Sequence, residues 1–165
     1  MRPRLHYAKH APGIYEAMDA LDQYLAKADG VDEKLLHLVR LRASQLNGCA
    51  YCIDMHWKDL RALGDTEQRL ASLDAWRECP YYSDRERAAL EWTEAVTRIA
   101  DGHAPDAVYE AVRPHFGERE LCDLTLAIAT INAWNRLSIA ARLVPGGYQP
   151  AAPMGVVAGV PVAAG

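Results

Sequence analysis

The sequence predicts an all-α fold in a single domain, and two observations support that prediction. Apolar residues recur three and four positions apart over long segments, as they do on the buried face of a helix. Residues typical of helix starts and stops separate these segments, whereas strand signals are nearly absent. At 165 residues, of which 50% are hydrophobic and 24% charged, the chain is long enough to enclose one sizeable core.

Three helices are expected in the first part of the chain. Asp32 precedes an apolar segment and is suited to cap the second of them. That helix is expected to stop at Asn47 and Gly48, because both residue types accept the left-handed backbone of a helix C-terminus. A new helix then begins around Cys49. The expected bounds are about 12–28, 32–47 and 49–64.

Two capping-box patterns mark helix starts in the second part of the chain. Asp65 is followed three residues later by Gln68, and Ser83 is followed in the same way by Glu86. The last expected helix, Glu118–Leu143, is apolar on nearly every side, so it should be buried either centrally or between subunits. The expected helices are one opened at residue 65 and others at about 83–102, 105–117 and 118–143, which gives about six to seven in total.

The domain is expected to span residues 1–143. The following stretch, 144–165, contains no charged residue, four prolines and five glycines. This composition is too broken for a membrane-spanning helix and predicts a disordered C-terminal tail. No apolar run follows the basic residues near the N-terminus, so we expect a cytoplasmic protein without a membrane partner. The net charge of −4 and pI near 5.8 provide no basic surface, which argues against nucleic-acid binding.

The segment NGCAYCIDMH, residues 47–56, contains the candidate functional residues Cys49, Cys52 and His56. In a helix, Cys49 and Cys52 lie one i,i+3 step apart, and Cys52 and His56 lie one i,i+4 step apart, so all three share a face. Unpaired N–H groups and the helix dipole favour a thiolate in the first turn. The pKa of one of the two thiols is therefore expected to lie well below its free value of about 8.5.

A fourth titratable side chain is predicted to reach the same place. If the helix before Asn47 folds back along the helix after Gly48, positions equally distant from the turn face each other. His37 stands ten residues before Asn47 and His56 stands nine after it, so the two imidazoles should be neighbours. We expect Asp54 and Asp59, in contrast, to face solvent and complement the helix dipole.

Three interpretations of this cluster remain open. In the first, the side chains only pack against each other in the core. In the second, Cys49, Cys52, His56 and His37 form a tetrahedral zinc site. In the third, the two thiols form a dithiol that cycles between reduced and oxidised states. In the dithiol interpretation, which needs no metal or cofactor, Cys52 gives its proton to His56 and attacks an oxidised substrate. Cys49 then closes a disulfide, and a carrier dithiol regenerates the pair by exchange. We favour the cycling dithiol.

The stretch LVRLRASQLNGCAYCIDMH, residues 38–56, resembles the AhpD-like branch of the carboxymuconolactone decarboxylase superfamily. INAWNRL, residues 131–137, is similar to a late helix of that family, and the resemblance covers about residues 12–143. It implies an AhpD-like helical bundle with its CxxC motif at a helix N-terminus, assembled as a trimer or hexamer. It also implies thiol-dependent reduction of a hydroperoxide or of a partner's disulfide.

The resemblance further implies roles for individual residues and partners. Cys49 and Cys52 would be the redox pair and His56 the proton-relay histidine. The family commonly has a glutamate twelve positions before the first cysteine, where this chain has His37, so the relay is altered here. The implied partners are a hydroperoxide substrate and a dithiol, thioredoxin-like or lipoyl electron donor. A lactone decarboxylase activity is a weaker alternative, because its chemistry does not need the cysteine pair.

Overall fold

The computed structural model describes residues 2–28 and 30–150, and the regular structure of this part is entirely helical. The all-α prediction is confirmed. The described part contains nine α-helices, of which six have seven residues or more, and two short 3₁₀ helices. No helix in it is long and apolar enough to cross a membrane. The α-helices are α1 (Tyr7–His10), α2 (Gly13–Lys27), α3 (Glu33–Asn47), α4 (Ala50–Ala62), α5 (Glu67–Ala71), α6 (Asp84–Thr97), α7 (Ile99–Gly102), α8 (Asp106–Val112) and α9 (Glu118–Ala141), and the 3₁₀ helices are η1 (Leu73–Ala75) and η2 (Arg113–His115).

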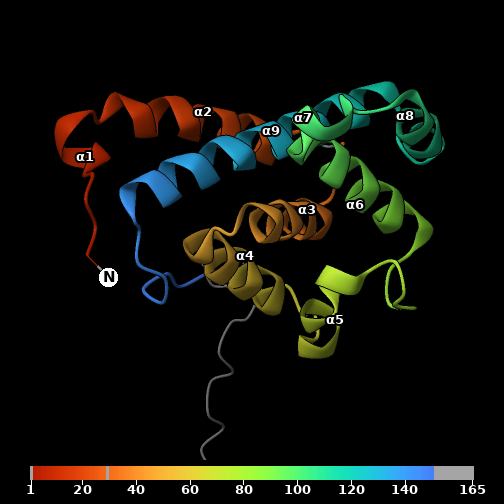
Figure 1. Cartoon of the computed structure of the whole chain (residues 1–165), viewed down its shortest axis with the longest axis horizontal. Helices are drawn as coiled ribbons and strands as arrows, with labels where there is room; N and C mark the ends of the chain where they lie inside the picture. The colour runs from red at the N-terminus through yellow and green to blue at the C-terminus, as the bar shows by residue number, and fades with distance from the viewer. Residues whose placement is uncertain (1, 29, 151–165) are drawn as a thin grey trace, which may run out of the picture.

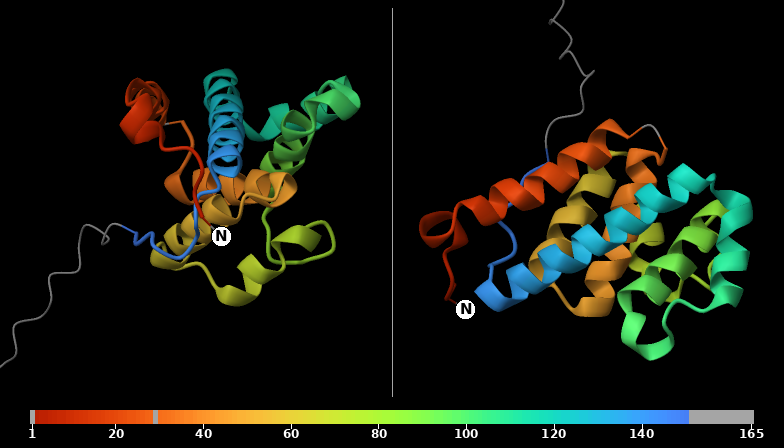
Figure 2. Two further views of the ribbon diagram at one scale, coloured as in Figure 1. Left: turned by 60° about the vertical axis from the view of Figure 1, so that its left-hand side comes forward. Right: turned by 90° about the horizontal axis from the view of Figure 1, so that it is seen from above.

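Helix α3 lies at the centre of the fold (Figure 1) and packs against α4, α6 and α9. On one side of it stand α2, α9 and α6, and on the other lies α4 (Figure 2). Helices α2 and α9 run side by side across α3. Helix α4 contacts both α3 and α9.

The sequence of α3 accounts for its central position. Its first turn is capped by Asp32, whose carboxylate accepts a hydrogen bond of 2.9 Å from the amide of Leu35. Its last turn is closed by Gly48 in the left-handed conformation, with φ of 69°. Both features were predicted, and between them the helix buries side chains on most of its surface, including Leu38 and Val39 at 0% exposure. Burial of such side chains contributes roughly 1.5–3 kcal/mol each.

Two predicted helix boundaries were wrong. Thr66, and not Asp65, caps α5, because the Asp65 carboxylate is buried and instead accepts a hydrogen bond from the amide of Thr66 next to it. The helix predicted to run to Gly102 ends at Thr97, since the backbone of Arg98 has φ of −97° and ψ of 40°, outside the helical region. Helix α7 is therefore a separate short turn.

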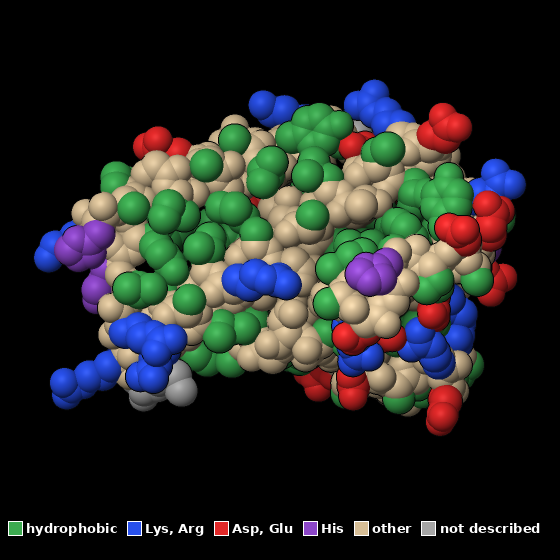
Figure 3. Space-filling model, turned by 45° about the horizontal axis from the view of Figure 1, so that its top comes forward, with side chains coloured by type: hydrophobic (Ala, Val, Ile, Leu, Met, Phe, Trp, Pro, Cys, Tyr) green, Lys and Arg blue, Asp and Glu red, His purple; other side chains and the backbone are tan. Residues whose placement is uncertain are grey.

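Helix α9 is partly buried, and Ile139 on its outer side is 45% exposed. It contacts α2, α3, α4 and α6, and eleven of its side chains are buried. Hydrophobic side chains also gather on the outer face over α2 and α9 (Figure 3). The exposed large ones on these two helices are Tyr15, Leu21, Tyr24 and Ile139. Most of the predicted tail, residues 151–165, lies outside the described residues.

Candidate functional site

The cysteine pair lies at the start of α4. Cys49 is the N-cap residue, and its sulfur accepts a hydrogen bond of 3.4 Å from the amide of Cys52. The two sulfurs form a disulfide, with the Cα atoms 5.4 Å apart, and both side chains are buried at 1% exposure. The predicted helix start and the meeting of the two thiols are therefore confirmed. The free amides of the first helical turn favour the anionic form of a reduced sulfur at this position.

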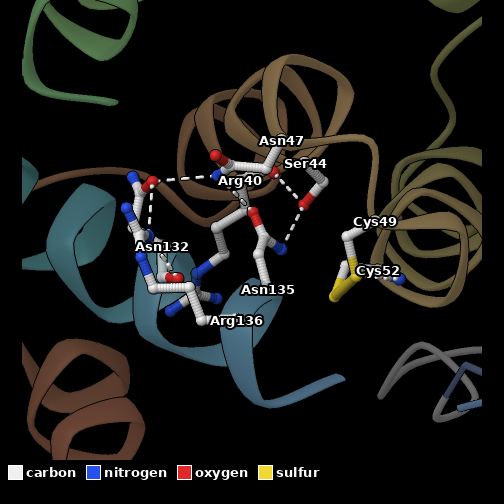
Figure 4. The surroundings of a disulfide bond; sticks show 8 residues. All are labelled: Arg40, Ser44, Asn47, Cys49, Cys52, Asn132, Asn135 and Arg136. Carbon is white, nitrogen blue, oxygen red and sulfur yellow. Dashed lines mark hydrogen bonds between the residues drawn. A yellow bond between two sulfur atoms is a disulfide. The ribbon is translucent and has the colours of Figure 1, made fainter. Parts of the chain in front are cut away.

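A group of buried amides holds the turn before the cysteines (Figure 4). The side-chain amide of Asn47 donates hydrogen bonds of 2.9 Å to the oxygens of Asn132 and of Asn135. Asn135 in turn donates to the hydroxyl of Ser44 at 3.0 Å. We call Ser44, Asn47, Asn132 and Asn135 the polar clamp. It fixes the α3–α4 turn against α9, which gives the INAWNRL segment a structural role.

The two predicted histidines meet. His37 Nδ1 lies 3.2 Å from His56 Nδ1, as the hairpin geometry predicted. Asp59 completes the group, with its Oδ2 atom 3.3 Å from His37 Nδ1 and 3.4 Å from His56 Nδ1. The prediction that Asp59 faces solvent was wrong, because the residue is buried at 8% exposure. Its position three residues after His56 is the sequence signal that would have placed it on the same face.

Burial sets the protonation of this group. It lowers the pKa of His37 to about 4, an effect to which the neighbouring His56 adds. Burial also lowers the pKa of His56, despite the opposing hydrogen bond with Asp59. For Asp59, burial alone would raise the pKa, but hydrogen bonds from His56 and Tyr148 hold it below its ordinary value. At neutral pH the site thus contains two neutral imidazoles and one carboxylate.

The segment after α9 packs over α4 and reaches the same group. The Tyr148 hydroxyl donates a hydrogen bond of 2.6 Å to Asp59 Oδ1. Lys58 donates to the backbone oxygens of Gly146 at 3.3 Å and of Tyr148 at 3.1 Å. Asp54, also expected to face solvent, accepts from the amide of Gly146 at 3.0 Å. No local sequence pattern predicted the role of Tyr148, whose surroundings are rich in proline and glycine.

A cavity of about 640 Å³ adjoins the cysteines and the histidines. It lies between α2, α3, α4 and α9, and the segment after α9 contributes Tyr148. Cys52 lines this cavity together with both histidines and Asp59. Arg40, the one arginine on its wall within the described part of the chain, pairs with Asp22 at 3.1 Å. Apolar residues form much of the remaining wall, among them Leu25, Leu36, Met55, Ile131 and Trp134.

One further atom of the site is important for its chemistry. His56 Nε2 is buried and has no hydrogen-bond partner among the described residues. Its ring follows Cys52 by one helical turn and lines the same cavity. A buried ring nitrogen without a partner is free to exchange a proton with a group that enters the cavity. The fold and site together define a helical protein with a buried CxxC pair next to two histidines.

Comparison with known proteins places the chain in a family. The family model described as the carboxymuconolactone decarboxylase family matches residues 12–95, and the chain belongs to that family. The YdfG protein of Bacillus subtilis, which is uncharacterised, is 44% identical over 140 residues, covering 85% of this chain and 95% of that protein. The uncharacterised YnjA of Escherichia coli is 32% identical over 115 residues, covering 69% of this chain and 62% of that protein.

Solved structures place the chain in the AhpD-like branch. The protein of unknown function ATU0492 from Agrobacterium tumefaciens, provisionally assigned to antioxidant defence as an AhpD protein, superposes with a TM-score of 0.82. It is 41% identical, and the match covers 91% of this chain and 99% of that one. The debrominase Bmp8 shares the fold, with a TM-score of 0.68 at 17% identity over 82% of this chain and 73% of that one. The family prediction is confirmed.

Proposed function

We propose that the protein is a dithiol-dependent oxidoreductase that reduces hydroperoxides, with Cys49 and Cys52 as its redox pair. The observation that carries this proposal is the disulfide across the CxxC motif at the start of α4, next to a cavity lined by Cys52 and His56. A pair that bonds at this helix start can also cycle, because its thiolate form is favoured there once the disulfide is reduced.

The proposed reaction has two chemical steps. In the first, His56 takes the proton of Cys52, and the thiolate attacks the terminal oxygen of a hydroperoxide. The O–O bond breaks, Cys52 becomes a sulfenic acid, and the proton on His56 passes to the departing alkoxide to give an alcohol. In the second, the sulfur of Cys49 attacks that of Cys52, water leaves, and the disulfide forms. A carrier dithiol then reduces the disulfide by exchange, so one hydroperoxide consumes one dithiol.

The cavity supports Cys52 as the attacking residue. Cys52 is on the cavity wall, whereas Cys49 is not among the residues that line it. Cys49 sits at the N-cap, from which it can close the disulfide without moving the helix. The apolar wall favours an organic hydroperoxide over hydrogen peroxide, because apolar surface on the substrate would be buried there.

His37 has a supporting role in this proposal. It occupies the position at which the family commonly has a glutamate, and it contacts His56 directly. We propose that Asp59 and His37 together orient the His56 ring, so that Nε2 faces the reacting sulfur. If a carboxylate at position 37 serves the relay better, His37→Glu will raise the turnover rate.

Peroxide consumption with a supplied dithiol tests the proposal. We expect Cys49→Ser and Cys52→Ser each to lose at least about 100-fold of the cumene hydroperoxide turnover. Cys122→Ser is the matched control, because Cys122 is an exposed free cysteine, and it should retain the wild-type rate. Full hydroperoxide turnover in both variants of the pair would contradict the proposal. The lactone decarboxylase alternative, which does not use the thiols, predicts no dithiol-dependent hydroperoxide consumption even in the wild type.

The alternative from a different class is a non-enzymatic module that binds zinc, or senses oxidants, through the same four side chains. We consider its zinc-binding form here. It would use Cys49, Cys52, His56 and His37 as ligands, which requires two free thiolates. Stoichiometric zinc in the reduced protein, together with thiols that do not react with an alkylating reagent, would favour it. Two fast-reacting thiols in metal-free protein would favour the enzyme.

We further propose self-association, as a trimer or hexamer, in the reducing environment of the cytoplasm. The exposed hydrophobic side chains over α2 and α9 (Figure 3) support an interface between subunits. Light scattering after size-exclusion chromatography measures the subunit number, and a monomer at micromolar concentration would contradict this part of the proposal.

A further inference from the structure

Three possible metal-ligand atoms lie close together in the cavity that Cys52 also lines. His37 Nδ1, His56 Nδ1 and Asp59 Oδ2 form a nearly equilateral triangle, with sides of 3.2, 3.3 and 3.4 Å. The three residues come from two helices, α3 and α4, whose packing fixes them relative to each other. Two imidazoles and one carboxylate are a donor set that zinc accepts in proteins.

The size of this triangle matches the ligand shell of a tetrahedral ion. Zinc binds histidine nitrogen at about 2.0–2.1 Å and carboxylate oxygen at about 2.0–2.2 Å, so neighbouring ligand atoms in a tetrahedron lie about 3.3–3.5 Å apart. The observed sides differ from this range by about 0.1 Å at most. Little rearrangement would therefore be needed on binding, which removes a large part of its cost.

A hydrogen bond from outside the triangle restrains one of the three ligands. The second oxygen of Asp59 accepts the hydrogen bond from Tyr148, at 2.6 Å. Glu33 Oε1 lies 4.0 Å from the outer nitrogen of His37, Nε2, which is beyond hydrogen-bond distance. A hydrogen-bonded partner such as Tyr148 orients a metal-binding side chain. All three ligands also line the cavity, so a water molecule or small anion can reach the fourth position.

We propose that His37, His56 and Asp59 form a binding site for a divalent ion of the zinc class, with its fourth position open to the cavity. The site differs from a Cys₂His₂ site because Asp59 replaces both sulfurs, which remain bonded to each other. Zinc binding itself does not depend on the proposed enzymatic function. If that function also holds, a bound ion restrains His56 and slows oxidation of the dithiol, so zinc acts as an inhibitor.

Calorimetric titration of chelator-treated, oxidised protein with Zn²⁺ tests the site. We expect one ion per chain, bound with a dissociation constant in the micromolar range or below. His37→Ala and Asp59→Asn should each weaken binding at least 10-fold. His103→Ala, which removes an exposed histidine, is the matched control and should bind like the wild type, as should the double variant Cys49→Ser/Cys52→Ser. Thermal melts of every variant verify folding.

Substitution by Co²⁺ supplies a second readout on the wild type alone. The expected spectrum is that of a tetrahedral ion without a thiolate charge-transfer band. The proposal is overturned if the oxidised wild type binds no zinc, if His37→Ala and Asp59→Asn bind as tightly as the wild type, or if the cysteine double variant loses binding. Loss of peroxidase activity would leave these results unchanged, so the two proposals fail separately.

Discussion

Replacement of Asn135 by alanine tests whether the polar clamp holds the turn before the cysteines. Asn135 is fully buried, accepts a hydrogen bond from Asn47 and donates one to Ser44. Alanine removes both bonds, at about 1 kcal/mol each, and leaves a void that costs about 1 kcal/mol more. We therefore expect the free energy of unfolding to fall by about 3 kcal/mol, from a total that is about 5–15 kcal/mol in proteins of this kind.

Urea denaturation followed by circular dichroism measures this change, and a thermal melt should show the midpoint lowered by about 6–12 °C. Gln23→Ala is the matched control, because Gln23 is an exposed amide that donates a hydrogen bond to the nearby Asp19. Its effect should stay within about 0.5 kcal/mol. A loss below about 1 kcal/mol for Asn135→Ala would refute the reasoning, since it would mean that the clamp contributes little to holding α3 and α4 against α9.

Three other predictions concern Tyr148, Gly48 and Glu94. Tyr148→Phe removes the hydrogen bond to Asp59 and should lower the free energy of unfolding by about 1.5–3 kcal/mol in urea denaturation, because the acceptor is charged; an unchanged midpoint would mean that the contact is absent in solution. Gly48→Ala should cost about 1 kcal/mol, since φ of 69° is unfavourable for alanine, and a neutral or stabilising effect would contradict the left-handed cap. Burial alone would raise the pKa of Glu94, but hydrogen bonds from Trp76, Arg77 and Arg42 hold it below its ordinary value. The ionised Glu94 side chain therefore stabilises the fold at neutral pH, and this stabilisation is lost as the pH falls through about 4.5 and below. In Glu94→Gln the free energy of unfolding should fall less steeply as the pH is lowered from about 6 to about 3, the range in which a carboxylate titrates. The same slope as in the wild type would contradict the lowered pKa of Glu94.

Local sequence signals predicted much of the fold. The cap at Asp32, the left-handed Gly48 and the helix start at Cys49 depend on residues next to each other in the chain. Residue spacing was also sufficient to predict that His37 meets His56, because the short turn between α3 and α4 leaves little freedom in their pairing.

The remainder of the site depends on tertiary packing. Asp59 was predicted to face solvent, since acidic residues near helix starts usually do, but the segment after α9 covers it. Tyr148 reaches Asp59 from 89 residues further along the chain. No periodicity links positions so far apart, and the same holds for the pairing of Asn47 with Asn132 and Asn135. Such contacts follow from the placement of α9 rather than from any local pattern.

A single-turnover reaction tests the proposed redox role of Cys49 and Cys52 most directly. Fully reduced protein is mixed with one equivalent of cumene hydroperoxide, without any electron donor, and intact mass and peptide mapping are then measured. We predict one alcohol formed per chain and the loss of two hydrogen atoms, with a new disulfide joining Cys49 to Cys52. Unconsumed hydroperoxide, or oxidation confined to Cys79 and Cys122, would contradict a dithiol cycle at the start of α4.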